Sequence, residues 1–463
     1  MPTPPDEPLL ETAHAQADDD DRRGSRDGGE LFERVLGELG IAVTDRSSAA
    51  RPVVPLSSRL DTAALAWASV SAVMVAAGRS PEDLDPARVA VAYGSDRVLT
   101  VDGAAPPVWS PYSGFWRTSD GWIRTHGNYP HHAARLRAGL GLQKGAGAEA
   151  VRDVLAEQQS APAVAAITAA GGLAVRVMAE APATDRLLGA RPLLEINRVE
   201  AVSPSPLSRS TSADARSEHR PLQGMRVLDL TRVIAGPVCT RTLALLGADV
   251  LRIDPPQLPE PEWQHLDTGH GKRSAVLDAR DPQLEELIER ADAVVLGYRP
   301  AALDRLGLNP EELARRHSGL VVAQLSAWGT EHPDRAGFDS LVQAESGIAL
   351  IESPDGDRPG ALPVQALDHS AGYLLAAAVT TLLRRRPPRP DGSWVVRTSL
   401  RRVAAELLLM PRRRQPNAAL GFAVDPHVTR FVLGDTSLTT ARPALPGFEF
   451  DAPHPWGSDQ PRW

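Results

Sequence analysis

The residues with the clearest chemical potential lie where a predicted strand runs into a predicted helix, at 228–237. The segment reads Leu-Asp-Leu-Thr-Arg-Val-Ile-Ala-Gly-Pro. Because Gly236 and Pro237 open the helix, several N–H groups of its first turn lack partners within the helix. Free N–H groups at a helix start favour anions. The segment therefore predicts a site for a phosphate or for the polar backbone of a cofactor.

Two common nucleotide-binding motifs are missing from the candidate segments. Residues 228–237 lack the Gly-x-Gly-x-x-Gly spacing of a dinucleotide site. Residues 269–273, Gly-His-Gly-Lys-Arg, lack the spaced glycine and the following Ser or Thr of a P-loop. The sequence thus disfavours NAD and nucleoside triphosphates as ligands.

One aspartate and a group of histidines are the other candidates for chemistry. Asp339 follows an aromatic residue in Gly-Phe-Asp-Ser-Leu-Val-Gln, and taken alone it is typical of a helix N-cap or a surface acid. His126, His131 and His132 are numerous enough to suggest a metal cluster, but no carboxylate accompanies them at ligand spacing. We therefore predict no metal site, and we interpret the histidines as a polar loop packed between domains.

The composition indicates a soluble protein of more than one domain. At 463 residues the chain exceeds the usual size of one hydrophobic core. A formal net charge of -8 gives no overall field for nucleic acid or an anionic membrane surface. The apolar stretch at 65–78 is shorter than the ~20 residues of a membrane span. With Cys239 as the only cysteine and no signal-like N-terminus, we expect a cytoplasmic protein without nucleic-acid or membrane partners.

Composition and periodicity divide the chain into six segments. They are an acidic, disordered tail at 1–28, a helix-strand unit at 29–104, a small α+β domain at 105–200, a linker at 201–220, a large domain at 221–403 and a C-terminal extension at 404–463. Strand and helix patterns alternate through the large domain, which predicts a parallel sheet covered by helices. The expected fold class is α/β, with a Rossmann-like parallel sheet in the large domain and a smaller α+β domain.

A short internal repeat is visible in the sequence. Leu-Asp at 60–61 and again at 367–368 opens an apolar helix. Each helix is followed by a predicted strand, at 89–91 and at 395–397. Matching units of this kind indicate duplication. The first unit is therefore predicted to be a partial copy of the large domain.

Several motifs occur in order between residue 222 and about residue 403. They are Leu-Gln-Gly-Met-Arg-Val-Leu-Asp-Leu at 222–230, Leu-Gly-Ala-Asp-Val-Leu-Arg-Ile at 246–253, Gly-Lys-Arg-Ser at 271–274, Tyr-Arg-Pro at 298–300, Leu-Asp-Arg-Leu-Gly-Leu at 303–308, Leu-Ser-Ala-Trp-Gly at 325–329 and Gly-Phe-Asp-Ser-Leu-Val-Gln-Ala-Glu-Ser-Gly at 337–347. This order resembles the family III CoA-transferases. The resemblance implies the family's fold and an enzyme that moves CoA from an acyl-CoA thioester to a carboxylic acid.

The resemblance also implies roles for individual residues. Asp339 matches the family's nucleophile, which forms an aspartyl anhydride and then an aspartyl-CoA thioester. Gly329 and Gly347 lie in turns whose N–H groups would stabilise the oxyanions. The implied CoA contacts are Val233, Ala235, Lys272, Tyr298 and Arg305. Acyl-CoA and acid enter as substrates without a permanently bound cofactor, and the family's assembly implies a homodimer.

The sequence departs from the family's pattern at several positions. Pro255 and Pro256 stand where the family often carries an arginine, and Gly297 stands where it often carries an asparagine. The contacts to adenine and phosphate are therefore expected to differ. The small domain also precedes the large one, so we interpret the chain as a permuted or partly duplicated member with one active site.

Two alternative functions remain open from the sequence. The α-methylacyl-CoA racemases resemble the same family but pair a histidine with an aspartate to move a proton beside the thioester. Phe338 stands where they carry that histidine, so His126 or His369 would have to act as the base. The other alternative is a non-catalytic CoA-binding protein, which the altered CoA-contact positions favour.

Overall fold

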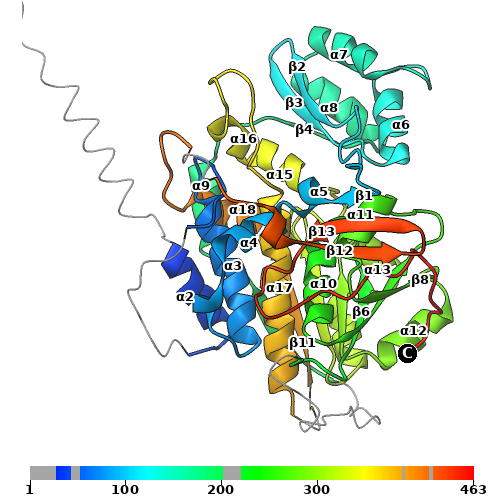
Figure 1. The fold of residues 1–463 in the computed structure, drawn as a ribbon. Coiled ribbons are helices and arrows are strands. Elements are labelled where there is room, and N and C mark those ends of the chain that lie inside the picture. The colour runs from blue at the N-terminus through cyan, green and yellow to red at the C-terminus, as the bar shows by residue number, and fades with distance from the viewer. Residues whose placement is uncertain (1–27, 43–52, 202–219, 388–389, 391, 417–420) are drawn as a thin grey trace, which may run out of the picture.

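The computed structural model describes residues 28–42, 53–201, 220–387, 390, 392–416 and 421–463. Most of the expected tail at 1–28 and linker at 201–220 lies outside these ranges. Gly28, the last residue of that tail, instead begins helix α2 (Gly28–Glu38). The described residues form a large α/β unit with a small sheet domain above it and a short third sheet along one side (Figure 1).

The large domain is built on a seven-stranded sheet in the order β5-β11-β10-β9-β6-β7-β8. Its strands are β5 (Glu195–Glu200), β6 (Arg226–Leu230), β7 (Asp249–Asp254), β8 (Lys272–Val276), β9 (Ala293–Leu296), β10 (Val321–Ser326) and β11 (Gly392–Ser399). All pairs are parallel except β5 with β11. The predicted α/β fold class with a parallel sheet is confirmed.

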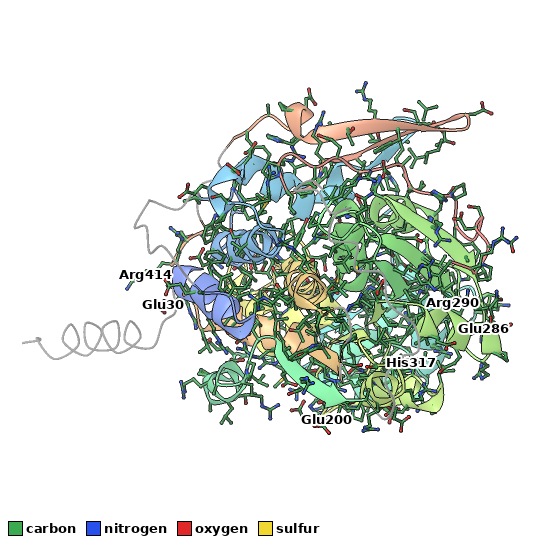
Figure 2. The ribbon with its side chains drawn as sticks, turned by 90° about the horizontal axis from the view of Figure 1, so that it is seen from below. Glu30, Glu200, Glu286, Arg290, His317 and Arg414 are labelled. Carbon is green, nitrogen blue, oxygen red and sulfur yellow. The ribbon has the colours of Figure 1, made fainter. Side chains whose placement is uncertain are left out.

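Helices cover both faces of this sheet, because neighbouring residues of a strand point to opposite sides. Val227 packs into one apolar core, and Leu228 packs into the other. The first face carries α10 (Ala235–Leu245) and α17 (Ala366–Arg385), and the second carries α12 (Pro282–Glu289), α13 (Pro300–Arg305) and α14 (Pro310–Arg316). In Figure 2, α17 lies at the centre, and charged side chains such as Glu200, Glu286 and Arg290 lie at the periphery.

The small domain has its own sheet and core. Its antiparallel strands are β2 (Gly114–Thr118), β3 (Gly121–Thr125) and β4 (Ala174–Arg176), and its helices are α6 (Pro130–Gly139), α7 (Ala148–Glu157) and α8 (Ser160–Ala169). Trp116, Ile123 and Leu136 are buried between sheet and helices. The other side of the sheet lies against α15 (Asp339–Ser346), followed by α16 (Ile348–Ile351) (Figure 1).

The predicted strand at 89–91 is wrong, and with it the helix-strand repeat. These residues lie in helix α4 (Pro86–Tyr93). The Asp85 carboxylate accepts a hydrogen bond from the Ala87 N–H at 2.9 Å and caps this helix, while Pro86 presets its first turn. A short connecting element, η1 (Pro81–Asp83), precedes α4, and another, α5 (Ser95–Val98), follows it. The preceding helix α3 (Thr62–Ala76) packs directly on α17 in the core of the large domain.

The C-terminal segment is integrated into the fold. Helix α18 (Leu400–Leu408) joins the main core, while η3 (Asp425–His427), β12 (Val428–Leu433) and β13 (Thr436–Ala441) form a hairpin unit that pairs with β1 (Thr100–Val101). Further on, Asp459 exchanges hydrogen bonds with Ser274 of the edge strand β8 at 2.8 Å. The remaining helices are α9 (Pro182–Gly189) and α11 (Glu262–Thr268).

Within the residues that the structure describes, one helix, α17, is long and apolar enough to cross a membrane by length and composition alone. Its most apolar window is 94% buried inside the protein. It contacts α3, α10 and the strands β10 and β11. We therefore interpret α17 as the central core helix.

Candidate active site

A cleft of about 1150 Å³ lies between the small domain and the large sheet. From β6 the chain continues outward to β7 and β8, whereas from β9 it continues in the opposite direction to β10 and β11. The loops after β6 and β9 contribute Arg232, Val233, Tyr298 and Arg299 to the cleft wall. Ligands of open parallel sheets bind at such a reversal of strand order, beyond the carboxyl ends of the strands.

Asp339 is the first residue of α15 and is 1% exposed. One carboxylate oxygen accepts a hydrogen bond from the Gln343 side-chain amide, one helical turn later. The other accepts from the backbone N–H of Asp368 at 3.0 Å. Gln343 is itself fixed, because its oxygen accepts from the Leu362 N–H at 2.9 Å. The carboxylate is thus held in one orientation, between Phe338 and Asp368, both of which line the cleft.

Asp339 and Asp368 form a pair of buried acids. Burial raises the pKa of Asp339 to about 6, even though the hydrogen bonds from Asp368 and Gln343 favour its charged form. Burial, together with the negative charge of Asp339, raises the pKa of Asp368 well above its ordinary value. These shifts indicate that Asp339 ionises more readily than Asp368.

The small domain covers the start of α15. The His126 ring stacks on the Phe338 ring with a centroid distance of 3.7 Å and an interplanar angle of 4°. The Met178 N–H donates to the Ala344 carbonyl at 3.0 Å, further along the helix. Burial lowers the pKa of His126 well below its ordinary value, so this imidazole is neutral.

The other histidines lie close to the same stack. His132 contacts the edges of both the His126 and Phe338 rings, and His131 packs on His132. Both His131 and His132 line the cleft. Across the described ranges, no group of three or more His, Cys, Asp or Glu side chains is arranged to hold a metal ion.

Three of the CoA contacts implied by the resemblance line the cleft: Val233, Ala235 and Tyr298. Val233 has φ = 74°, a backbone conformation that β-branched residues rarely adopt. Such strain often accompanies a functional site.

Gly297 stands where the family often carries an asparagine. A Cβ on Gly297 would lie 3.1 Å from the Thr231 Cβ, so a larger residue there would require a small shift.

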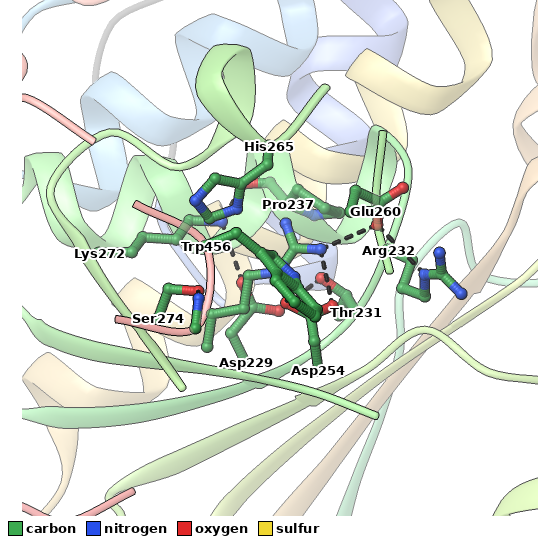
Figure 3. Close-up of polar contacts among 12 residues, drawn as sticks. Asp229, Thr231, Arg232, Pro237, Asp254, Glu260, His265, Lys272, Ser274 and Trp456 are labelled. Carbon is green, nitrogen blue, oxygen red and sulfur yellow. Dashed lines mark hydrogen bonds and ion pairs between the residues drawn. The ribbon is translucent and has the colours of Figure 1, made fainter. Parts of the chain in front are cut away.

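The other two implied CoA contacts lie elsewhere. Lys272 is buried below the cleft, where its Nζ donates to Asp229 at 2.9 Å and to the Pro237 carbonyl at 3.0 Å (Figure 3). Its predicted contact with CoA is not supported by this position. Arg305 is exposed and pairs with Asp334 at 3.2 Å, and Asp334 lines the cleft, so Arg305 lies at the cleft rim.

Both glycines implied in oxyanion stabilisation are placed unfavourably. Gly347 is the C-cap of α15, so the eight-residue helix separates it from Asp339 by ~12 Å. The Gly329 N–H donates to the Ser326 hydroxyl at 3.1 Å. The N–H of Asp368 is the better candidate, because it already points at the Asp339 carboxylate.

A buried charge network lies beside the cleft and was not predicted from the sequence. Arg252 pairs with Asp254 at 2.7 Å and with Glu260 at 2.8 Å, and Glu260 also pairs with Arg232 at 3.2 Å (Figure 3). The Tyr129 hydroxyl donates to Glu260 and ties the small domain to this network. The available signal was Arg252 itself, a charged residue between the apolar Leu251 and Ile253 of β7.

Comparison with known proteins finds similarity over part of the chain. Residues 222–412 match the family model described as CoA-transferase family III. A Mycobacterium tuberculosis protein named "Probable fatty acyl-CoA transferase Rv3272" is 34% identical over 180 residues, which cover 35% of this chain and 45% of that protein. The mouse "Succinyl-CoA:glutarate CoA-transferase" is 32% identical over 181 residues, covering 35% and 41%. The crystal structure of Rv3272 aligns at 32% identity with a TM-score of 0.37, covering 41% of this chain and 56% of that one.

The protein is thus an α/β protein whose cleft lies where the strand order of its parallel sheet reverses. Within that class, residues 222–412 are similar to CoA-transferase family III. The chain matches less than half of the length of the two curated relatives, 45% and 41%. Its small domain precedes the matched region instead of lying within or after it.

Proposed function

We propose that this protein is a CoA-transferase that moves CoA from an acyl-CoA thioester to a carboxylic acid, with Asp339 as the nucleophile. The observation that carries the proposal is the fixed, ionised Asp339 carboxylate next to a cleft at the reversal of the sheet. A nucleophilic carboxylate must be charged and oriented toward its substrate. The relatives named as CoA-transferases support the same class of reaction.

The proposed reaction proceeds in balanced acyl transfers. An Asp339 oxygen attacks the thioester carbonyl carbon, the carbon–sulfur bond breaks, and CoA leaves as a thiolate. The thiolate then attacks the Asp339 Cγ of the mixed anhydride, which releases the donor acid as a carboxylate. An acceptor carboxylate repeats both steps in reverse and departs as the new acyl-CoA. The Asp339 carboxylate is regenerated without net uptake of a proton.

The hydrogen bonds at Asp339 suit the second step. When the thiolate attacks Cγ, negative charge develops on an Asp339 oxygen. The N–H of Asp368, at 3.0 Å from this oxygen in the resting protein, would stabilise that charge. The Gln343 amide would do the same for the other oxygen. Backbone and amide donors thus replace the two glycine turns as candidates for this role.

The proposed path of CoA follows the cleft wall. Val233, Ala235 and Tyr298 would contact the cofactor chain, and Arg305 at the rim would reach its phosphates. Lys272 would act indirectly, because it holds the Pro237 carbonyl at the start of α10. Homodimer assembly and a cytoplasmic location belong to the same proposal, and light scattering of the purified protein tests the first.

Trapping the acyl-enzyme tests the function directly. During turnover with acyl-CoA donors, hydroxylamine should capture the Asp339 acyl species, and mass spectrometry should find a hydroxamate on the peptide containing Asp339. Asp339→Asn should abolish both CoA exchange and the modified peptide. The matched control Asp355→Asn, at an exposed aspartate, should retain both. Exchange in Asp339→Asn at the wild-type rate would exclude this nucleophile, and CoA binding without exchange in the wild type would favour a non-catalytic CoA-binding protein.

Racemisation is a second candidate function because of the His126 position. A neutral imidazole stacked on Phe338 and the carboxylate of the next residue, Asp339, could exchange a proton with the carbon beside a thioester. The test is incubation of a 2-methylacyl-CoA in deuterated water. Deuterium at the α-carbon without transfer to acids, abolished in His126→Ala, would favour the racemase and count against the transferase.

A further inference from the structure

Arg124 lies on the face of the small sheet that covers the nucleophile. Along β3, Ile123 and Thr125 point into the core of the small domain. Because successive residues of a strand point to opposite faces, Arg124 and His126 share the other face. The stack of His126 on Phe338 shows that this face meets the start of α15. Arg124 is therefore directed toward the same region as Asp339.

The environment of Arg124 is unusual for a cation. Its guanidinium lies 4.8 Å from the Phe115 ring centroid and 5.1 Å from that of Trp109. Its Nε is buried and has no hydrogen-bond partner. Burial lowers the pKa of Arg124 to about 10, so the side chain stays charged at neutral pH, and Asp339 is the one charged group that opposes this shift. A buried guanidinium N–H without an acceptor is costly, and an anion bound there during function would supply that acceptor.

Arg124 and Asp339 attract each other without touching. Their charges interact, but no hydrogen bond between the two contributes to the pKa of either group. The buried Nε of Arg124 is thus not engaged by the nucleophile. A guanidinium matches a carboxylate in shape and can donate two parallel hydrogen bonds to it.

We propose that Arg124 binds the carboxylate of the acceptor acid, and that of the departing donor acid, beside Asp339. This inference rests on the proposed transferase function. In the aspartyl-CoA thioester, Asp339 carries no charge, so Arg124 loses the one charge that offsets its own. An incoming carboxylate restores the balance, whereas water does not. Arg124 would thereby favour transfer to an acid over hydrolysis of the thioester.

The chemical step fits this position. The acceptor carboxylate, held by Arg124, attacks the Asp339 Cγ of the thioester. A carbon–oxygen bond forms, the carbon–sulfur bond breaks, and CoA thiolate leaves. The thiolate then attacks the acceptor's carbonyl carbon, the anhydride bond breaks, and Asp339 recovers its carboxylate. Arg124 holds the reacting group and takes no part in bond formation.

Steady-state kinetics of Arg124→Gln test the proposal. We expect the KM for the acceptor acid to rise about 10- to 100-fold, the value of a charge-assisted contact, with the KM for acyl-CoA changed less than about 3-fold. Arg124→Lys should recover part of the loss. The matched control Arg117→Gln removes an exposed arginine of the neighbouring strand β2 and should match the wild type. An unchanged acceptor KM in Arg124→Gln would overturn the inference and leave the transferase function intact.

A neutral acceptor separates carboxylate binding from a structural role. Hydroxylamine needs no cation, so capture of the Asp339 thioester should proceed in Arg124→Gln at close to the wild-type rate. Equal loss of hydroxylamine capture and of transfer to acids would show instead that Arg124 only supports the fold or the nucleophile. Circular dichroism confirms that each variant is folded.

Direct binding distinguishes failure of the inference from failure of the function. In Asp339→Asn, which removes the competing charge, binding of ¹³C-labelled butyrate is measured by NMR relaxation. We expect the added Arg124→Gln substitution to weaken this binding at least about 10-fold. Arg124-dependent binding, together with an absence of CoA exchange in the wild-type protein, would keep the carboxylate site and reject the transferase. Binding that is independent of Arg124 would reject the site.

Discussion

Two sets of buried charges in this protein lie close together and differ in character. In the network of Asp229, Lys272, Arg252, Asp254 and Glu260, every carboxylate faces a cation within 3 Å. In the site of Asp339, Asp368 and Arg124, two acids lie together and the nearest cation does not touch them. The first arrangement links strands of the sheet, and the second is the one that we propose acts on a substrate.

The two sets of charges differ in the direction in which the pKa of their acids is shifted. Burial alone would raise the pKa of Asp229, but the charges of Lys272 and Arg252 lower it below its ordinary value. Burial of Asp339 is offset less completely, and its pKa rises to about 6. Perturbed acids of the second kind concentrate at functional sites. A sequence motif alone did not separate the two sets, because it assigned Lys272 to the ligand.

The sharpest test of the contrast is Lys272→Met. Removal of one partner leaves Asp229 buried with weaker compensation, which we expect to destabilise the protein by about 3 to 5 kcal/mol. Urea unfolding measures the change. The control Lys144→Met, at an exposed lysine, should leave stability unchanged. Normal stability with weakened CoA binding would instead make Lys272 a ligand contact.

Substitution of Asp339 should increase stability, whereas substitution of Lys272 should decrease it. The folded-state pKa of Asp339 is raised, so the folded protein binds more protons than the unfolded one between about pH 4 and 6, and stability falls as pH rises through that range. Asp339→Asn removes the free-energy cost of ionising the buried carboxylate at neutral pH. The loss of one hydrogen bond offsets part of this gain. We expect about 2 kcal/mol of added stability in urea unfolding, together with loss of activity. Destabilisation would show that the charge is well accommodated.

The pH dependence of turnover tests the same group without mutation. Since Asp339 must be ionised to attack, kcat/KM should fall about tenfold per pH unit below pH 6. The unfolding curve at pH 5 serves as the control that the protein remains folded. A flat profile from pH 7 to 5 would contradict the assigned pKa.

The smallest effect on stability is expected at Tyr129, which links the small domain to the buried charge network. Tyr129→Phe removes the hydroxyl that donates to Glu260, while the pairs of Glu260 with Arg252 and Arg232 remain. We expect a loss of about 1 kcal/mol in stability. The comparison variant is Tyr112→Phe, whose hydroxyl bonds a carbonyl within the small domain. A much larger loss in Tyr129→Phe would mean that the network depends on the small domain.

The elements with regular patterns were predictable, and the long-range contacts were not. Strand β9 is a continuous apolar run and β10 is apolar except for Gln324 and Ser326, the pattern of a doubly covered parallel sheet, and the prediction of that sheet is confirmed. The strand at 89–91 failed because Asp85 and Pro86 supply a helix start that outweighs a short β-branched run. Asp368 and Arg124 were missed as partners of Asp339 because only the tertiary fold brings them together.

The packing of α3 on α17 has a consequence for synthesis. Thirteen of the fifteen residues of α3 are buried, and the surface that buries them includes α17, which is made much later. At about 5 to 20 residues per second, the ribosome takes roughly 15 to 60 s between the end of α3 and the start of α17. Throughout that interval the nascent chain carries an apolar helix without its final neighbours. Production of this protein should therefore depend on chaperones that bind exposed apolar segments.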